Sequence, residues 1–245
     1  MMSVSGGRVA LVTGANKGIG LEVVRQLAGL GVECLLGARA EVRGKRAEGE
    51  LAAAGLRVRA VRLDVTDPVS VAALAKWVER EYGRLDVLVN NAGIVGSFNG
   101  PPSEVGGEDM REVFETNVFG VVTVTNAMLP LLRRSPAGRI VNLSSDAGSL
   151  TLNADEQSPF RGYNLMTYQS SKTALNALTV AYAKELRGTG IKVNSANPGF
   201  TATDINGHRG HRTVEEGARI AVRLATLGSD GPTGTSQDDN GTVPW

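Results

Sequence analysis

A short apolar run that leads directly into a glycine-rich turn, and then into a helical pattern, constrains the fold of this 245-residue chain most strongly. Residues 8–12 read Arg-Val-Ala-Leu-Val, and residues 13–20 read Thr-Gly-Ala-Asn-Lys-Gly-Ile-Gly. Gly14, Gly18 and Gly20 lack a Cβ atom, so the backbone can turn tightly and a ligand can approach it. The helix that follows directs free N–H groups at the turn, which favours an anion. The pattern therefore predicts a phosphate site in a strand–turn–helix unit.

The spacing of these glycines, G-x-x-x-G-x-G, differs from the G-x-G-x-x-G dinucleotide fingerprint and from the phosphate loop that ends in Gly-Lys-Ser or Gly-Lys-Thr. A glycine-rich turn without any ligand is therefore an alternative for residues 13–20 taken alone. The turn is, however, the first strand-to-helix connection of the chain, where open α/β sheets place a pyrophosphate. Its position favours a dinucleotide.

Strand-like and helix-like patterns alternate along the chain. Runs rich in Val, Leu and Ile recur near residues 8–13, 32–37, 57–63, 85–89, 138–144 and 190–196. Apolar residues at helical spacing occupy residues 19–30, 68–82 and 213–227. The alternation predicts an α/β fold: a single-domain, Rossmann-like, doubly wound parallel sheet of six or seven strands with helices on both faces, spanning residues 1–245. The seventh strand is expected near residues 234–237.

Local signals add detail to this fold. Thr66-Asp67-Pro68 predicts the start of a helix, and Gly83 predicts a helix C-cap. Residues 108–134 are predicted to form one long helix with Asn117 in its middle. Because asparagine is a poor helix former, Asn117 indicates either a kink or a functional task.

Composition excludes several classes of partner. The chain has 26 basic and 25 acidic residues without a clustered basic stripe, so we expect neither nucleic acid nor a membrane surface as partner. No run approaches the ~20 apolar residues of a membrane span, and the N-terminal residues contain no apolar run of signal-peptide length. Cys34 is the one cysteine, so no internal disulfide forms. These features favour a cytoplasmic protein that acts on small molecules.

Tyr168 and Lys172 lie four residues apart in a helical pattern and therefore share one helix face. A nearby ammonium lowers the pKa of a phenol from about 10, which would make Tyr168 a better proton donor to a carbonyl oxygen. Ser145 closes an apolar strand at the carboxyl edge of the sheet, where its hydroxyl could orient such a carbonyl. The alternatives are a solvated tyrosine–lysine pair and a serine that caps a turn.

The motifs together resemble those of the short-chain dehydrogenase/reductases. They occur in the order of that family and span almost the whole chain: Thr13-Gly-x-x-x-Gly-x-Gly20, Asn90-Asn91-Ala92-Gly93, Asn117, Ser145, Tyr168-x-x-x-Lys172 and Asn197-Pro198-Gly199. Within the family the chain is most similar to the NADPH-dependent carbonyl reductases. The resemblance implies that Tyr168 is the general acid, that Ser145 holds the carbonyl, that Lys172 grips the nicotinamide ribose and lowers the tyrosine pKa, and that Asn117 binds a relay water.

The resemblance also implies a cofactor site along the carboxyl edge of the sheet. The implied cofactor-binding residues are Gly14, Asn16, Lys17, Gly18, Ile19, Gly20, Arg39, Asp64, Val65, Asn91, Ala92, Gly93, Tyr168, Lys172, Pro198, Gly199, Thr201 and Thr203. A site for NAD(H) requires an acidic residue about 20 positions beyond the first glycine, whereas this chain has Arg39 there and Lys17 in the turn. Two cations suit a phosphate, so NADP(H) is preferred over NAD(H); two solvated surface charges are the alternative.

Two segments depart from the pattern of the family. Ser145 and Tyr168 are 23 positions apart, where most members use about 13, so residues 146–164 form an inserted segment. A longer insertion at this place accompanies a monomeric state in the mammalian carbonyl reductases that the chain resembles, so the resemblance favours a monomer, with a homodimer also possible. The segment could instead cap the substrate pocket or be a surface loop. Residues 200–215 are polar and rich in glycine, as in a mobile substrate lid. This segment contains His208 and His211, but no acidic or cysteine partner at ligand spacing, so we expect no metal.

The sequence thus predicts an NADPH-dependent reductase of aldehydes and ketones that is reversible in principle. One alternative is a non-catalytic, NADP-binding sensor or scaffold, because fold does not imply function. Another keeps the fold and the cofactor but acts on an imine, an activated alkene or a carrier-bound ketone.

Overall fold

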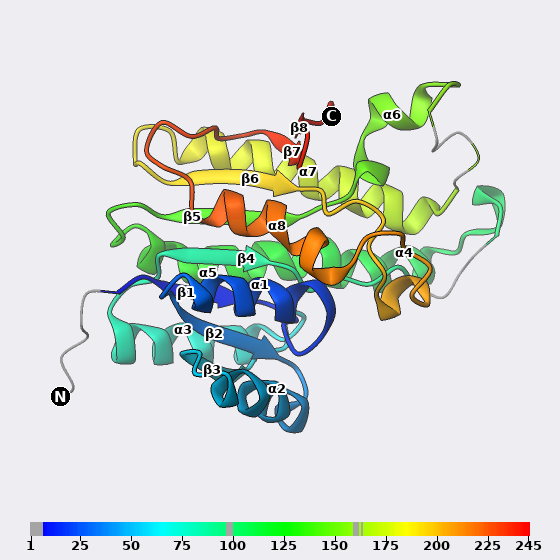
Figure 1. Ribbon diagram of the computed structural model, residues 1–245. Coiled ribbons are helices and arrows are strands. Elements are labelled where there is room, and N and C mark those ends of the chain that lie inside the picture. The colour runs from blue at the N-terminus through cyan, green and yellow to red at the C-terminus, as the bar shows by residue number, and fades with distance from the viewer. Residues whose placement is uncertain (1–6, 97–99, 159–161, 163) are drawn as a thin grey trace.

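The computed structural model describes residues 7–96, 100–158, 162 and 164–245. Within these ranges the chain forms one eight-stranded sheet with the order β3-β2-β1-β4-β5-β6-β7-β8 (Figure 1). The strands are β1 (Val9–Val12), β2 (Glu33–Ala38), β3 (Val58–Arg62), β4 (Val87–Asn90), β5 (Arg139–Leu143), β6 (Lys192–Ala196), β7 (Ser236–Asp238) and β8 (Gly241–Thr242). Neighbouring strands are parallel except for β7 and β8, which pair as an antiparallel hairpin.

The doubly wound parallel sheet is confirmed, but the expected number of six or seven strands is too low. The additional strand, β8, pairs through only Gly241 and Thr242 with the end of β7. Two residues cannot display the period-two alternation that identifies a strand in a sequence. The strand expected near residues 234–237 is β7, which pairs with β6 through Ser236 and Gln237.

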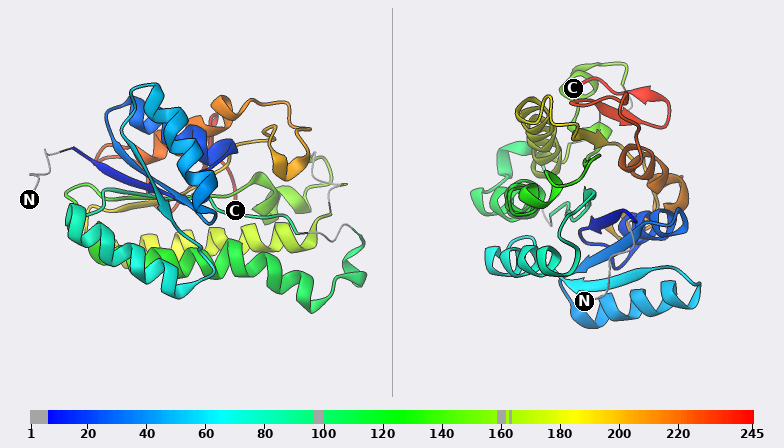
Figure 2. Two further views of the ribbon diagram at one scale, coloured as in Figure 1. Left: turned by 90° about the horizontal axis from the view of Figure 1, so that it is seen from below. Right: turned by 90° about the vertical axis from the view of Figure 1, so that its left-hand side faces the viewer.

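Helices cover both faces of the sheet, as the three layers in Figure 2 show. The α-helices are α1 (Gly18–Gly29), α2 (Glu41–Ala53), α3 (Pro68–Tyr82), α4 (Gly107–Phe114), α5 (Gly120–Leu132), α6 (Leu150–Ala154), α7 (Met166–Glu185) and α8 (Val214–Ala225). Short 3-10 turns occupy Pro102–Glu104, Asp146–Gly148 and Asp204–Asn206. No helix in the described part of the chain is long and apolar enough to span a membrane.

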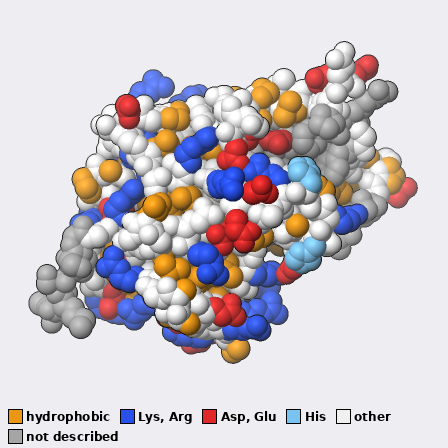
Figure 3. All heavy atoms as spheres, in the orientation of Figure 1, with side chains coloured by type: hydrophobic (Ala, Val, Ile, Leu, Met, Phe, Trp, Pro, Cys, Tyr) orange, Lys and Arg blue, Asp and Glu red, His pale blue; other side chains and the backbone are white. Residues whose placement is uncertain are grey.

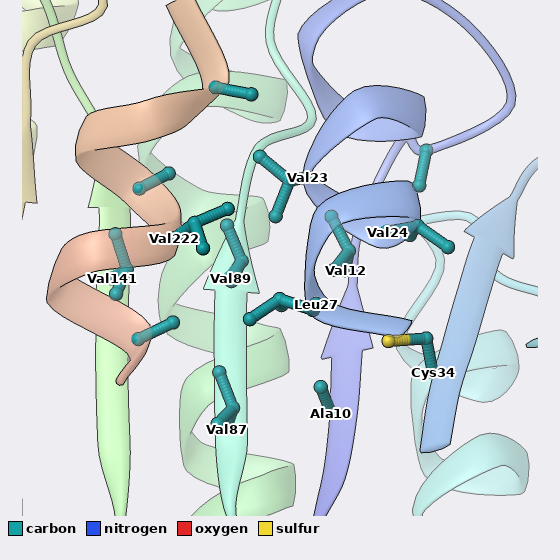
Figure 4. Close-up of a cluster of buried hydrophobic side chains, with 14 of the residues drawn as sticks. Ala10, Val12, Val23, Val24, Leu27, Cys34, Val87, Val89, Val141 and Val222 are labelled. Carbon is teal, nitrogen blue, oxygen red and sulfur yellow. The ribbon is translucent and has the colours of Figure 1, made fainter. Parts of the chain in front are cut away.

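Alternate residues of the strands supply two separate cores. Ala10 and Val12 of β1 pack with α1, α2 and α8, whereas Val9 and Leu11 pack with α3, α5 and α7. Successive side chains of a strand point to opposite faces, so each strand contributes to both cores. Figure 4 shows the first core, in which α1 and α8 lie over β1, β4 and β5. Both faces are buried, as expected for a parallel sheet whose strands read as continuous apolar runs.

The start and the end that the sequence predicted for the helix α3 are both confirmed. The Asp67 side chain accepts a hydrogen bond from the Val69 N–H at 2.9 Å and caps α3, and Pro68 is the first helical residue. Gly83 ends α3 in the left-handed conformation, with φ of 72°. The long helix expected over residues 108–134 is present but not uniform, because a π-helical turn, Glu115–Phe119, joins α4 to α5. Asn117 lies in that turn.

Candidate active site

The strand order reverses between β1 and β4, and the glycine-rich turn lies at this point. Gly14 and Gly18 have φ values of 62° and 58°, which residues with a side chain rarely adopt. A Cβ on Gly14 would lie 2.9 Å from the Ala92 Cα atom, so the turn after β1 packs directly against the turn after β4. Such a reversal creates a crevice at the carboxyl ends of the strands, where α/β proteins bind ligands.

Two polar side chains join the turns after β1 and β4. The Thr13 hydroxyl accepts hydrogen bonds from the N–H groups of Asn91 and Ala92, at 3.0 and 2.9 Å. The Asn91 amide donates to the carbonyl oxygens of Thr13 and Gly14, at 2.8 and 3.1 Å. A Cβ on Gly20 would lie 2.3 Å from the Asn91 Nδ2 atom, so glycine is needed there. The crevice is therefore fixed by hydrogen bonds within the chain.

The start of α1 fits an anionic group. No side chain in the described part of the chain caps this helix at Lys17, so its first N–H groups have no side-chain partner there. Gly18 and Thr203 approach each other closely, because a Cβ on Gly18 would lie 3.6 Å from the Thr203 Cγ2 atom. Residues 13–20 therefore provide what a pyrophosphate needs: close access to the backbone and uncapped donors at a helix N-terminus.

Lys172 is the charged group at the centre of the predicted catalytic set. Its side chain is 5% exposed, and its ammonium donates to the Leu143 carbonyl oxygen at 2.8 Å. Burial lowers the pKa of Lys172 to about 8, because a charged ammonium loses hydration there. Its Nζ atom lies 5.5 Å from the centre of the Tyr168 ring. The helix thus brings the lysine and the tyrosine together as their spacing predicted.

Asn117 joins the same centre from the π-helical turn. Its Oδ1 atom accepts from the Ile94 N–H at 2.9 Å, and its Nδ2 atom donates to the Ile94 carbonyl and to the Ser171 hydroxyl at 2.8 and 3.0 Å. A Cβ on Gly93 would lie 3.3 Å from Asn117 Oδ1 and 3.5 Å from Lys172 Nζ. The side-chain amide is thus held between the Ile94 backbone and α7.

Ser145 lies at the end of β5, on the turn that precedes α6. Its hydroxyl oxygen accepts from the Ala147 N–H at 3.2 Å, so Ser145 also caps the short Asp146–Gly148 turn. The capping alternative and the catalytic prediction are compatible, because a hydroxyl that accepts one bond can still donate another. A Cβ on Gly148 would lie 2.8 Å from Lys172 atoms, so this turn packs directly on α7.

The residues predicted to receive the adenine end lie at the ends of β2 and β3. Asp64 is held by the Ser70 and Thr66 side chains at the start of the α3 connection, and Val65 packs so tightly on α5 that a Cβ on Gly120 would lie 2.9 Å from it. Arg39 follows β2 and is exposed. It has no hydrogen bond or ion pair with other residues that the structure describes, and neither has Asn16.

The Pro198–Thr203 stretch leads from β6 into the predicted lid. The Thr201 hydroxyl donates to the Pro198 carbonyl at 3.1 Å, which closes a tight turn beside the crevice. In the lid, Asp204 forms an ion pair with Lys17 at 2.5 Å and contacts His208. Both partners, Lys17 first, hold the pKa of the Asp204 carboxyl below its usual range. Figure 3 shows the two histidines on the rim of this face, among charged side chains.

The inserted segment contains a short helix, α6, which the polar sequence did not suggest. Residues 159–161 and 163 of this segment lie outside the described residues. In Figure 1, α6 and the lid (orange) lie beyond the carboxyl ends of the strands, on the same side as the start of α7.

Several residues that organise the site were missed by the sequence reasoning. Ser171 accepts a hydrogen bond from Asn117. Its position three residues after Tyr168 on the same helix could have indicated that it lies near the predicted site. Thr13, at the end of β1, was visible in the glycine motif but received no role. Arg43, four residues after Arg39 in the first turn of α2, makes no contact of this kind with other described residues but is a second exposed cation near the end of β2. The Asp204 partner of Lys17 is 187 residues away along the chain, and no local pattern reveals it.

Comparisons with known proteins find related sequences and related structures. A family model described as short chain dehydrogenase matches residues 8–213. The chain is 36% identical to short-chain dehydrogenase/reductase 1 of Saponaria officinalis, which covers 97% of this chain and 96% of that protein. It is also 36% identical to carbonyl reductase (NADPH) 1 of Sus scrofa, which covers 97% of this chain and 94% of that protein. The solved structure of an NADPH-bound carbonyl reductase from chicken fatty liver is similar with a TM-score of 0.85 and 32% identity, covering 98% of this chain and 99% of that one.

Proposed function

The chain belongs to the short chain dehydrogenase family, and on this premise we propose that it is an NADPH-dependent reductase that converts aldehydes or ketones into alcohols, reversibly. Its reductase relatives identify it as an NADP-dependent oxidoreductase acting on C=O and CH–OH groups. The observation that carries the finer proposal is that Lys172 and Asn117 both face Gly93, where an added Cβ would lie 3.5 Å from Lys172 Nζ and 3.3 Å from Asn117 Oδ1, with the centre of the Tyr168 ring 5.5 Å from Lys172 Nζ.

In this proposal Tyr168 donates the proton that a carbonyl oxygen takes up during reduction. A phenol is a weak acid, and a neighbouring positive charge stabilises the phenolate that remains after donation. Lys172 is the charge in the right place, 5.5 Å from the ring and held by the Leu143 carbonyl. Ser145 donates to the substrate oxygen and fixes its direction, while Asn117 holds a water through which Tyr168 regains its proton.

The proposed cofactor site is the crevice between the turns after β1 and β4. Bound NADP(H) would supply or accept the hydride; the protein contributes alignment and a proton. The uncapped start of α1, with Gly14, Asn16, Gly18, Ile19 and Gly20, would hold the pyrophosphate. The adenine side would rest on Asp64 and Val65. The nicotinamide side would rest on Tyr168 and Lys172, with the lysine on the ribose, and on Asn91, Ala92, Gly93, Pro198, Gly199, Thr201 and Thr203.

A preference for NADP(H) over NAD(H) is proposed from the charges at the end of β2. Arg39 is exposed and unpaired within the described ranges, and Arg43, which is also exposed, lies four residues further on in the first turn of α2. Guanidinium groups bind phosphate through paired N–H donors. Lys17 would contribute a third charge, although it pairs with Asp204 in this structure.

Turnover of NADPH tests this proposal and separates it from the alternatives. We expect wild-type protein to lower NADPH absorbance in the presence of ketones or aldehydes, and to form the corresponding alcohol. Binding of NADPH without turnover across a carbonyl panel would favour the sensor or scaffold. Turnover confined to an imine, an activated alkene or a carrier-bound ketone would keep the fold and cofactor but change the substrate.

We further propose that the protein is a monomer and acts in the cytoplasm. Sedimentation of the full chain would test the first part, and its localisation in cells would test the second.

A further inference from the structure

The connection between Ser145 and Tyr168 raises a positional problem. Ser145 is attached to the sheet at the end of β5, whereas Tyr168 stands on the first turn of α7. Proton donation tolerates only about 2.6–3.2 Å between heavy atoms. Some contact must therefore hold the first turn of α7 at a fixed distance from the turn that carries Ser145.

The middle of α7 is held to the turn after Ser145 by direct hydrogen bonds. The Thr173 hydroxyl donates to the Gly148 carbonyl at 2.9 Å, and the Asn176 amide donates to the same oxygen at 3.3 Å. The Ser144 hydroxyl donates to the Asn176 Oδ1 atom at 2.7 Å. These contacts lie one to two helical turns beyond Tyr168, so they do not by themselves fix the start of the helix.

Two side-chain amides continue the connection to the start of α7. The Asn153 Nδ2 atom, at the end of α6, donates to the carbonyl oxygens of Ala147 and Ser149 at 2.9 and 2.7 Å. The Asn153 Oδ1 atom accepts from Gln169 Nε2, and the Gln169 Oε1 atom accepts from the Leu165 N–H at 2.7 Å. Leu165 is the N-cap residue of α7 and has no side-chain cap of its own. Gln169 therefore caps the helix and also joins it to Asn153.

These contacts form one continuous path from the turn after Ser145 to the first turn of α7. The path begins at the Ala147 N–H, which donates to the Ser145 hydroxyl oxygen, and passes through Asn153 to Gln169, the neighbour of Tyr168. We infer that Asn153 and Gln169 are a pair of positioning residues that set the separation between the Ser145 and Tyr168 hydroxyls. This inference rests on the proposed reductase function, in which both hydroxyls meet one carbonyl oxygen.

The pair acts at a distance from the cofactor crevice, so its removal has a distinctive signature. A misplacement of about 1 Å in a catalytic group can cost about a hundredfold in rate. The crevice between β1 and β4 is held by Thr13 and Asn91, which do not depend on the pair. Loss of the pair should therefore lower kcat much more than it raises the Kd for NADPH.

The test compares Gln169→Met, Asn153→Ala and the double variant with wild-type protein, using Gln157→Met as the matched control. Gln157 is an exposed glutamine of the same inserted segment, and its side chain has no hydrogen bond to other described residues. We expect either single change to lower kcat by about ten- to a hundredfold. The double variant should be no slower than the slower single variant, because both changes break the same path. The control should keep the wild-type kcat and Kd.

Three results would overturn the inference: an unchanged kcat in Gln169→Met, multiplied losses in the double variant, or a Kd for NADPH that rises by the factor by which kcat falls. The last result would mean general structural damage. If the wild type reduces no carbonyl, the proposed function fails. Hydrogen exchange then tests separately whether Asn153 and Gln169 hold the start of α7. Faster exchange of the Leu165 amide in Gln169→Met would support the path as a constraint on α7, and unchanged exchange would refute it.

Discussion

The buried polar centre around Lys172 and the charged rim around Lys17 lie at the same end of the sheet but are held by different forces. Lys172 and Asn117 are 5% and 1% exposed and are bound by short hydrogen bonds to the backbone. Lys17 and Asp204 have side chains that are 58% and 54% exposed and meet through an ion pair. Exposed pairs contribute about 0–1 kcal/mol and exchange partners easily, whereas buried polar groups are costly to disturb.

Under the proposed function, this difference suits the two regions to separate tasks. A preorganised, buried centre suits a proton transfer, since its dipoles need not reorganise during the reaction. An exposed rim with movable charges suits the recognition of a cofactor phosphate that arrives from solvent. We therefore expect changes in the centre to act on kcat and changes in the rim to act on the choice of coenzyme.

Removal of the Tyr168 hydroxyl should have the largest effect. We expect Tyr168→Phe to lower kcat about a thousandfold, because the proton donor is lost, while NADPH still binds. Tyr82→Phe is the control, since Tyr82 binds Glu33 far from the site. Steady-state reduction with one responsive ketone measures the effect, and a kcat near the wild-type value would refute the role of Tyr168.

Removal of the Lys172 charge should have the second largest effect. We expect Lys172→Met to lower kcat about a hundredfold, since the phenolate loses its stabilising neighbour. Lys184→Met provides the control on the exposed face of the same helix. If kcat stays unchanged while KM for NADPH rises, the lysine serves binding alone, and the proposed link to Tyr168 is wrong.

The pH dependence of the centre follows from the pKa of Lys172 near 8. The lysine loses its charge as pH rises through this value, so kcat for reduction should fall above pH 8 by about tenfold per unit. Stability should change in the opposite direction. Between pH 8 and 10.5 the unfolded lysine still binds a proton that the folded one has released, so the free energy of unfolding rises relative to Lys172→Met. A flat rate between pH 7 and 9.5 would contradict this account.

Replacement of Arg39 tests the rim. We expect Arg39→Asp to shift the kcat/KM ratio of NADPH to NADH toward NADH by about ten- to a hundredfold, because a charge-assisted phosphate contact is lost and repulsion is added. Arg46→Asp is the control, because Arg46 pairs with Glu50 on the exposed face of α2. An unchanged ratio would show that Arg39 is a solvated surface charge.

The smallest expected effect concerns the partner of Lys17. Asp204→Asn removes the ion pair and leaves Lys17 available to a phosphate, so the Kd for NADPH should decrease about twofold at low salt. The gain should vanish in high salt, because exposed charges are screened. Weaker binding in this variant would mean that Asp204 supports the lid in the form that binds coenzyme.

The sequence predicted the centre better than the rim, for physical reasons. Tyr168 and Lys172 are four residues apart on one helix, so the helical period of 3.6 residues alone predicts that they lie on the same face. The parallel sheet was likewise readable, because strands buried on both faces are continuous apolar runs. Asn117 was recognised as unusual in a helix, although the π-helical turn that accommodates it was not foreseen.

Contacts between distant segments could not be predicted in this way. The pairing of Lys17 with Asp204 and of Asn153 with Gln169 depends on the path of two long connections. That path follows from how the connections pack on the sheet and on α7. The sequence predicted β7 but not β8 for a similar reason. The two residues of β8 form a strand only because they pair with β7.

One measurement tests the separation of tasks most directly: kcat and the Kd values for NADPH and NADH in Tyr168→Phe, Arg39→Asp and the double variant. If the two regions are independent, the fold-changes caused by the two substitutions multiply, because the free-energy effects of distant sites add. The double variant should then combine the low kcat of Tyr168→Phe with the altered coenzyme preference of Arg39→Asp. A double variant whose coenzyme preference returns to that of the wild type, or whose kcat departs from the product of the two single effects, would contradict the account.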